Sequence, residues 1–298
     1  MSLYKYVSCD TAMKILNGAI RMTPPSEFND PFELAVELYV PPHIEERNYN
    51  FSFDANSPRE SLGDYQLPDD FESEYCNDSN TRGIRRELDK YIGILCLSKR
   101  KDSHLMWAHY ADSYSGVVFE FNKNHPFFAG QIDIDYRAKR LKIDFDYFLK
   151  REVAIPLSVL FVKPDFWNYE EEVRITRTLH GLSKKKNSNG KPPMYLASIP
   201  MECIKSITLG ERTSPKDAKL LFNKIKNTNI ELNLAAISPW GYDFRYEPIK
   251  TNLPISEMNP IISPRTADIF KNVKGELGEA ARWTISNHPM RNIVSKTL

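Results

Sequence analysis

The stretch YIGILCLS, residues 91–98, is a nearly continuous apolar run. Short runs of this kind are typical of a strand that is covered on both faces. Downstream, GVVFEF at residues 116–121 predicts a second strong strand, because β-branched and aromatic side chains favour extended backbone. Upstream, the alternating LYKYVS at residues 3–8 predicts another strand. These segments together predict a sheet.

Outward from these segments, strands outnumber helices and do not alternate strictly with them. Periodicity and capping residues predict helices at 10–16, 82–90, 102–110, from about 143, at 215–225 and at 265–283. Further strands are predicted at 20–23, 131–136, 158–162, 170–176 and 204–210. We therefore expect a mixed α+β fold with a mainly antiparallel sheet and flanking helices.

Composition limits the class of protein. The chain has 298 residues, 40 Lys and Arg against 39 Asp and Glu, and 41% hydrophobic residues. This excludes disorder throughout and gives no bulk attraction to nucleic acid or anionic lipid. No run reaches the roughly 18 apolar residues of a membrane span, so we expect no membrane association and a cytoplasmic location. We expect one domain at 1–235, with a loop insertion at about 41–80, and a C-terminal extension at 236–298.

The densest polar cluster is WNYEEEVRI, residues 167–175. Side chains alternate along a strand, which predicts that Glu170, Glu172 and Arg174 share one face. Two carboxylates and a guanidinium are costly to bury unless they pair with each other or with a ligand. An exposed row of ion pairs on a solvated face is the alternative interpretation.

Two further clusters carry candidate site residues. In LMWAHYAD, residues 105–112, His109 is a candidate base or clamp, while Trp107 and Tyr110 offer flat faces to a ring or belong to the core. In SEFNDPFE, residues 26–33, Asn29 and Asp30 either satisfy turn amides or face the same cleft.

No nucleotide-binding loop, zinc motif or nucleophile elbow is present in the sequence. Oxygen ligands for a metal could come from Glu120, Asp133, Asp135 and Glu170, and this set would suit a metal-dependent nuclease. Alternating acids on a strand are ordinary, however, so no metal site is predicted.

Four motifs in register carry a resemblance to a known family. They are YKY at 4–6, PSEFNDPFE at 25–33, LCLSKRKDSHLMWAHYADSYSGVVFEF at 95–121 and FVKPDFWNYEEEVRI at 161–175. Their order and spacing resemble the mainly bacterial family called domain of unknown function 2971 (DUF2971), from about Leu3 to Gly210. The resemblance implies a defence or toxin setting for some members. The order of landmarks also resembles that of mono-ADP-ribosyltransferase folds.

This second resemblance implies an ADP-ribosyltransferase-like transferase that holds NAD, as substrate, in the cleft of a split sheet. Glu172 would orient the ribose while the glycosidic bond breaks, with Glu170 as its partner. Arg174 would pair a pyrophosphate or neutralise these glutamates. No unambiguous HYE or RSE triad is present. The remaining cofactor-binding residues that it implies are Tyr4, Lys5 and Tyr6 for the adenosine ribose or pyrophosphate, Thr23 or Ser26 for the nicotinamide ribose, Trp107, His109 and Tyr110 for the pocket wall, and Asn29 and Asp30 beside them.

Three alternatives stay open at this point. One is a non-catalytic module that binds a nucleotide or a peptide in the same cleft. Another is the metal-dependent nuclease, and the third is a structural or regulatory partner without a ligand. For the transferase, the acceptor is open between protein, nucleic acid and water, an antitoxin or defence-system partner is conceivable, and the oligomeric state is open.

Overall fold

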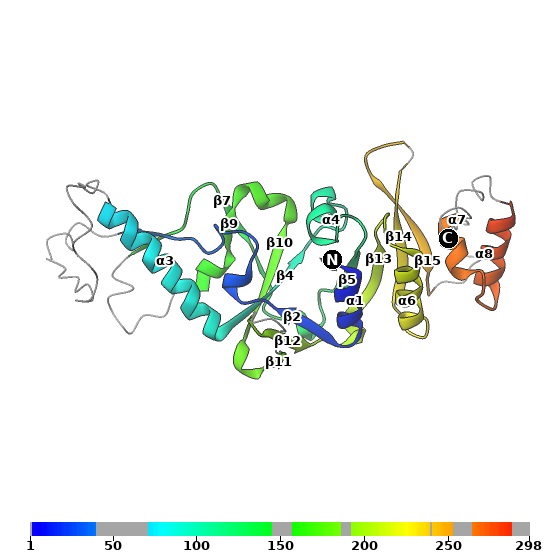
Figure 1. Cartoon of the computed structure of the whole chain (residues 1–298), viewed down its shortest axis with the longest axis horizontal. Coiled ribbons are helices and arrows are strands. Elements are labelled where there is room, and N and C mark those ends of the chain that lie inside the picture. The colour runs from blue at the N-terminus through cyan, green and yellow to red at the C-terminus, as the bar shows by residue number, and fades with distance from the viewer. Residues whose placement is uncertain are drawn as a thin grey trace, which may run out of the picture.

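A computed structural model describes residues 2–39, 71–144, 157–185, 192–238, 240–252 and 264–287 (Figure 1). In chain order its elements are β1 (Ser2–Val7), α1 (Cys9–Leu16), β2 (Ala19–Met22), η1 (Pro25–Glu27), β3 (Glu37–Tyr39), α3 (Phe71–Tyr91), β4 (Ile92–Ser98), α4 (His104–Tyr110), β5 (Val117–Asn122), η3 (Pro126–Phe128), β6 (Ile132–Asp133), β7 (Asp135–Arg137), β8 (Lys142–Asp144), η4 (Leu157–Phe161), β9 (Val162–Pro164), η5 (Asp165–Glu170), β10 (Glu172–Thr178), η6 (Leu179–Gly181), β11 (Ser183–Lys185), β12 (Met194–Ser198), η7 (Met201–Cys203), β13 (Ile204–Leu209), α6 (Pro215–Ile225), β14 (Glu231–Ile237), β15 (Phe244–Lys250), α7 (Pro264–Phe270) and α8 (Glu276–Asn287).

The fold is mixed α+β, as the sequence predicted, and its largest sheet is mostly antiparallel. Eight strands lie in the order β15-β14-β13-β5-β1-β4-β10-β6, and only the β13–β14 pair is parallel. A smaller sheet has the order β11-β12-β2. Figure 1 shows the elements strung along one long axis, with α3 at one end and α7 and α8 at the other.

The large sheet has a seam between β1 and β4. Strand β1 pairs with β5 over its whole length, from Ser2 to Val7, whereas its only register pair with β4 joins Tyr4 to Ser98. Beyond that pair the two strands separate, and β4 instead meets the chain that follows β2, through a bridge between Thr23 and Ile94. The seam therefore divides the sheet into two blocks and leaves room between them for side chains.

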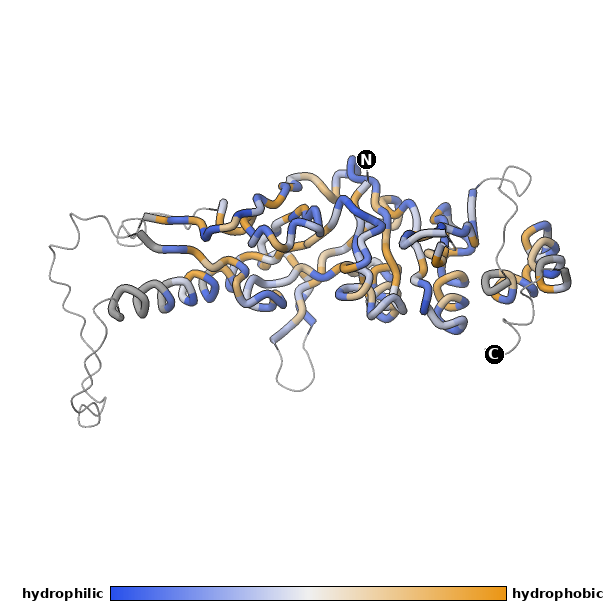
Figure 2. Tube along the Cα trace, turned by 90° about the horizontal axis from the view of Figure 1, so that it is seen from above, coloured by the Kyte–Doolittle hydropathy of each residue, from blue (hydrophilic) through white to orange (hydrophobic). Residues whose placement is uncertain are grey.

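Apolar side chains on one face of the sheet form the main core. Leu97 of β4 and Val173 of β10 lie there with Ile15 of α1 and Leu221 of α6. Alternation along the strands sends the neighbouring residues to the opposite face. On that face a second cluster joins Leu88 of α3 to the strands. A third cluster, which we name the aromatic cluster, gathers around Trp107 of α4. Its buried members are Tyr6, Met106, Trp107, Ala111, Val118 and Ala235, and the partly buried rings packed against them are Tyr4, Tyr110, Tyr114, Tyr169, Phe244 and Tyr246. The hydropathy colouring of Figure 2 shows apolar stretches along the strands in the middle of the molecule.

A left-handed turn fixes α4 against the sheet. Asp112, Ser113 and Tyr114 have φ values of 49°, 51° and 71°, which non-glycine residues adopt rarely. The turn closes through hydrogen bonds from the Tyr114 amide to the Trp107 carbonyl and from the Gly116 amide to the Ala111 carbonyl. Strain of this kind persists only where the surroundings over-determine it, so we infer that tight packing fixes the position of α4.

Several predicted segments differ from the structure. Residues 158–162 form no strand, because η4 covers 157–161 and β9 begins at Val162. Helix α3 begins at Phe71 and thus takes up the end of the segment expected to be a loop, while residues 41–70 lie outside the described residues. The residues at 142–144 form β8 where a helix was expected to begin, and 145–156 lie outside the described residues. The helix expected at 265–283 is two helices, α7 and α8.

The expected domain boundary lies inside a strand, and serines cap two of the helices. The boundary at residue 235 falls inside β14, and β14 pairs with β15 in the large sheet. Ser8 caps α1 and Ser103 caps α4, and each helix begins close to the start that the sequence predicted for it. The serine hydroxyl accepts the backbone N–H of the third residue that follows, as is usual at helix starts. None of the described helices combines the length and apolar character needed to cross a bilayer.

Candidate functional site

Strand β10 places Glu172 and Arg174 on the face opposite the main core. Their neighbours Val173 and Ile175 are buried in that core, and Glu172 and Arg174 lie beside Ser98 and Cys96 of β4. Glu172 is 5% exposed and Arg174 is 0% exposed. The carboxylate and the guanidinium are therefore turned into the molecule, and the exposed row of ion pairs does not occur here.

Glu170 reaches the same place by a different route from the one predicted. It is the last residue of η5, and Glu171 after it has φ 43° and ψ 51°, so the chain turns before β10 begins. Glu171 is exposed, and one of its carboxylate oxygens lies 3.7 Å from Arg100. The prediction that one continuous strand carries Glu170, Glu172 and Arg174 was wrong, because the left-handed residue interrupts it. The side chain of Glu170 is nevertheless buried beside that of Glu172.

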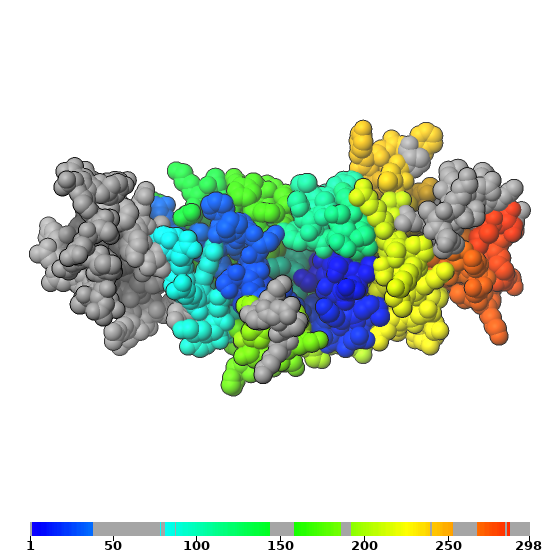
Figure 3. Space-filling model, in the orientation of Figure 1, coloured from blue at the N-terminus to red at the C-terminus, as the bar shows by residue number. Residues whose placement is uncertain are grey.

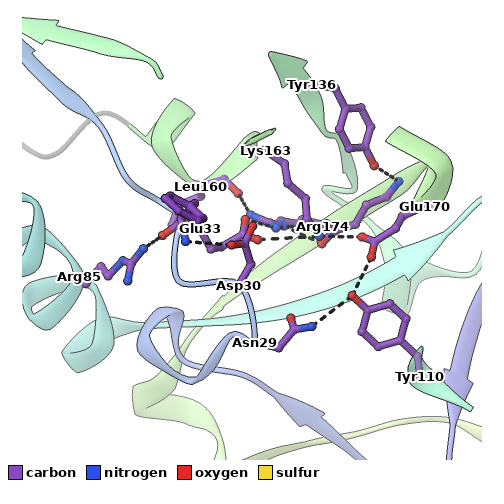
Figure 4. A network of polar contacts seen from close by, with 12 residues as sticks. Asn29, Asp30, Glu33, Arg85, Tyr110, Tyr136, Leu160, Lys163, Glu170 and Arg174 are labelled. Atoms are coloured by element: carbon purple, nitrogen blue, oxygen red, sulfur yellow. Dashed lines mark hydrogen bonds and ion pairs between the residues drawn. The ribbon is translucent and has the colours of Figure 1, made fainter. Parts of the chain in front are cut away.

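A buried network of five charged side chains results (Figure 4). Lys163 Nζ lies 2.6 Å from Glu170 Oε2 and 3.0 Å from Glu172 Oε2. Arg174 Nε donates to Glu172 Oε1 at 2.7 Å, and Arg174 Nη2 donates to Glu33 Oε1. Arg174 also donates to a backbone carbonyl, at Leu160, over 2.6 Å. We name Glu33, Lys163, Glu170, Glu172 and Arg174 the charged cluster.

Burial and ion pairing shift the pKa values of the charged cluster in opposite directions. Burial alone would raise the pKa of Glu172, but the charges of Arg174 and Lys163 outweigh it and lower that pKa to about 2. For Glu33 burial prevails, so its pKa is raised despite the same two cations. The pKa of Lys163 is raised, because its three carboxylate neighbours outweigh its own burial. Three carboxylates thus share two cations, and Glu33 is the one that burial drives toward the protonated form.

Two tyrosines connect the charged cluster to its surroundings. Tyr110 donates its hydroxyl hydrogen to Glu170 Oε1 at 2.7 Å and accepts a hydrogen bond from the Asn29 amide group at 3.4 Å. Burial, followed by the charge of Glu170, raises the pKa of Tyr110, so this hydroxyl stays protonated. On the other side, the hydroxyl oxygen of Tyr136 accepts the backbone N–H of Glu172 at 2.7 Å. The first contact holds the Glu170 carboxylate, and the second holds the backbone of Glu172.

A pocket of about 290 Å³ lies at the seam and exposes one side of the charged cluster. In Figure 3 the surface is hollowed between the blue N-terminal segment and the blue-green α4 segment. Lys5 spans the seam, since its Nζ donates to the Cys96 carbonyl at 2.9 Å, and burial lowers its pKa. Arg21 also lines the pocket and pairs with Glu27. Besides these, the pocket is lined by Tyr4, Tyr6, Thr23, Phe28, Asn29, Glu33, Cys96, Leu97, Ser98, Met106, Tyr110, Lys163, Glu170, Glu172 and Arg174.

Most of the residues that the sequence suggested line this one pocket. They are Tyr4, Lys5, Tyr6, Thr23, Asn29, Tyr110, Glu170, Glu172 and Arg174. Trp107 does not line it, because its ring is 0% exposed in the aromatic cluster and packs edge-on against Tyr6. His109 is exposed and lies beside the ring of Tyr110.

Two residues of the 26–33 segment also lie off the pocket lining. The Ser26 backbone N–H donates to Asp89 of α3, and the Ser26 side chain is exposed. Asp30 accepts the backbone N–H of Phe32, which is the turn contact that the sequence offered as its structural explanation. Its other carboxylate oxygen is buried with no hydrogen-bond partner within the described residues. Asp30 is thus a turn residue at the edge of the site.

Two residues that complete the charged cluster, Glu33 and Lys163, were not predicted from the sequence. Glu33 was inside a quoted motif but carried no signal of its own, since its partner Arg174 is 141 residues away. Lys163 also lay inside a quoted motif, seven residues before Glu170. A lone lysine in an aromatic turn is ordinarily taken as a solvated charge. Arg21 and Glu27, which pair with each other in the pocket lining, were not predicted from the sequence either.

The acids considered for a nuclease each have separate partners. Glu120 accepts hydrogen bonds from Ser2 and Ser206, Asp133 pairs with Lys99, and Asp135 pairs with Arg137. Among the described residues, no group of three His, Cys, Asp or Glu side chains is arranged to hold a metal ion. The structure therefore does not bring together the set that the nuclease hypothesis requires.

Comparison with known proteins does not identify a relative. No protein-family model, no curated protein and no solved structure matches the chain. The function has to be argued from the charged cluster and the pocket beside it.

Proposed function

We propose that the pocket binds the nicotinamide-ribose half of NAD and that the protein transfers ADP-ribose to an acceptor, as an ADP-ribosyltransferase-like enzyme. One observation carries the proposal: Glu170 and Glu172 line the same pocket as Tyr4 and Lys5, at a seam of the main sheet. A volume of about 290 Å³ is at the lower end for small-molecule pockets, which suits half of a dinucleotide.

The chemistry needs a carboxylate beside the reacting ribose carbon. The bond from ribose C1 to the nicotinamide nitrogen breaks, its electron pair leaves with nicotinamide, and the sugar acquires oxocarbenium character. A fixed carboxylate stabilises this charge and takes the proton of the attacking acceptor. We assign this role to Glu170, because its Oε1 is contacted by Tyr110, another residue of the pocket lining.

Glu172 then serves as a positioning residue. Cations hold both of its oxygens, Arg174 Nε at Oε1 over 2.7 Å and Lys163 Nζ at Oε2 over 3.0 Å, whereas Glu170 has a cation at one oxygen and the Tyr110 hydroxyl at the other. The lowered pKa of Glu172 shows why it is a poor base: the carboxylate is held ionised by its cations and does not take up a proton near neutral pH. This reverses the order of preference that the sequence suggested. Lys5 and Arg21, the other cations of the lining, are the groups that face a phosphate.

The test is nicotinamide release from NAD labelled in the nicotinamide ring, with and without cell extract as a source of acceptor. Glu170→Gln is expected to reduce release at least 100-fold, in line with the loss of a general base or charge stabiliser. Glu171→Gln is the matched control, because Glu171 is the adjacent glutamate and is exposed. It is expected to keep full activity.

Equal release by the wild type, Glu170→Gln and Glu171→Gln contradicts the assignment of Glu170. Absence of release by the wild type, with every acceptor fraction tried, contradicts the enzyme. Circular dichroism of each variant is measured first, so that loss of fold is not mistaken for loss of chemistry.

A second candidate function is favoured by a different observation. Each carboxylate of the charged cluster already has a cation within 3.0 Å, which suits a rigid recognition site as well as a reactive one. In that case the pocket is a non-catalytic nucleotide-binding module. It would bind NAD and ADP-ribose alike, raise the melting temperature with either, and release no nicotinamide.

A further inference from the structure

A second pocket, of about 250 Å³, lies behind the charged cluster. The chain from Asn29 to Val36 forms the wall between the two pockets: Asn29 and Glu33 line the first, and Phe32, Leu34 and Val36 line the second. Lys163 lines both. Leu34 has φ 60°, a left-handed conformation that lets the chain turn its side chain to the second pocket immediately after Glu33.

The lining of the second pocket is apolar with a cationic side. Its apolar residues are Phe32, Leu34, Ala35, Val36, Ala138, Leu141, Val159, Val162, Pro164 and Phe166. Phe32 and Phe166 are 56% and 62% exposed, which is unusual for rings of this size and leaves apolar area at the rim.

The charges around the second pocket are all of one sign. Arg137, Lys139, Arg140 and Lys163 line it, and no Asp or Glu is among the described residues that do so. Arg137 is paired with Asp135, and Lys163 belongs to the charged cluster, whereas Lys139 and Arg140 are exposed. An apolar cavity with two exposed cations beside it complements a molecule with an apolar body and an anionic end.

We propose that this second pocket binds a small amphipathic anion, with an unbranched apolar chain inside the cavity and a carboxylate at Lys139 and Arg140. The volume of about 250 Å³ limits the occupant to a small molecule. The site is separate from the nucleotide pocket, so the proposal goes beyond the proposed function and stands or falls without NAD.

The test is isothermal titration calorimetry of the full chain with octanoate, hexanoate and 1-octanol. Octanoate is expected to bind roughly 15-fold more tightly than hexanoate, because two more methylenes are buried. It is expected to bind more tightly than 1-octanol, which has the same chain and no charge. Ala138→Trp, which adds volume at the lining, is expected to weaken octanoate and octanol alike.

Charge variants locate the anionic end. The double variant Lys139→Glu, Arg140→Glu is expected to weaken octanoate at least fivefold and to leave 1-octanol unchanged. Its matched control is Lys216→Glu, Lys224→Glu, which reverses two exposed charges on α6 and should change neither ligand. Both doubles replace exposed side chains, so both should fold.

Three results overturn the proposal. They are no heat of binding with millimolar octanoate, equal affinity for octanoate and 1-octanol, and equal loss of octanoate binding in the two charge-reversal doubles.

Discussion

Removal of the Lys163 charge should destabilise the fold far more than removal of a lysine at the surface. In Lys163→Met the carboxylates of Glu33, Glu170 and Glu172 keep Arg174 as their one cation within the charged cluster. Breaking a buried ion pair from one side costs about 3–5 kcal/mol, because it leaves an uncompensated buried charge. The measurement is urea denaturation at pH 7.5, where this loss should lower the midpoint by on the order of 1–2 M.

The matched control is Lys99→Met. Lys99 Nζ lies 2.6 Å from Asp133, the same distance as between Lys163 and Glu170, but the Lys99 pair is 43% and 68% exposed while the Lys163 pair is 6% and 4% exposed. Surface pairs contribute about 0–1 kcal/mol, so this variant should unfold almost as the wild type does. The shortest distance is thereby held constant, while the burial of the pair and the number of carboxylates around the lysine differ.

The stability of Lys163→Met should also depend on pH, in a direction that the buried carboxylates determine. The charge of Lys163 lowers the pKa values of Glu33 and Glu172, so without it both pKa values rise in the folded state, which then binds more protons than the unfolded state. The variant should therefore gain stability when the pH is lowered from 7.5 to 5.5. Addition of Glu170→Gln should recover on the order of 1–2 kcal/mol at pH 7.5, because it removes one of the uncompensated charges.

Equal lowering of the midpoint by Lys163→Met and Lys99→Met would contradict this prediction. So would unfolding of Lys163→Met at the same urea concentration at both pH values.

Three further predictions follow from local geometry. Gly210→Ala should lower the free energy of unfolding by about 3 kcal/mol or more, since the new Cβ would lie 2.0 Å from the Tyr114 carbonyl oxygen. Gly83→Ala should raise that free energy by up to about 1 kcal/mol, because a Cβ on this helical residue would have nothing within 4 Å. Thermal melts of the two variants test both expectations. The pKa of Glu172 falls from 4.5 to about 2 on folding, so its contribution of up to about 3 kcal/mol is present above pH 4.5 and is lost as the pH falls toward 2; Glu172→Gln should show a shallower loss of stability over that range in acid titrations. Arg174→Lys should cost several kcal/mol, on the order of 2–4, despite the conserved charge, because a lysine reproduces neither the forked contacts nor the stacking on Phe28, and a melting temperature like that of the wild type would contradict this.

The parts of the fold that were predictable are those with a strong local pattern. The predictions of strand β4, strand β5 and helix α6 were confirmed. Their signals are an apolar run, a run of aromatic and β-branched residues, and a helical period, and each of these is contained within about ten residues. The prediction of a strand at 158–162 was wrong, because a short apolar run fits a buried turn as well as a strand.

The site was predictable in its composition but not in its connections. Alternation placed Glu172 and Arg174 on one face, and the structure agrees. The left-handed conformation of Glu171 has no sequence signal, since glutamate rarely adopts it. The prediction that Glu170 lies on the strand with Glu172 was therefore wrong, although its side chain is buried in the same cluster. The pairing of Glu33 with Arg174 depends on contacts far apart in the chain, which periodicity does not encode.

The single rung between Tyr4 and Ser98 has a mechanical consequence. Separating β1 from β5, by contrast, would disrupt six register pairs. Between β1 and β4 there is one register pair, supplemented by the hydrogen bond from Lys5 Nζ to the Cys96 carbonyl, so widening the sheet at this seam should break fewer main-chain hydrogen bonds. The pocket lined by Tyr4 and Lys5 therefore lies at a sparsely paired junction of the large sheet.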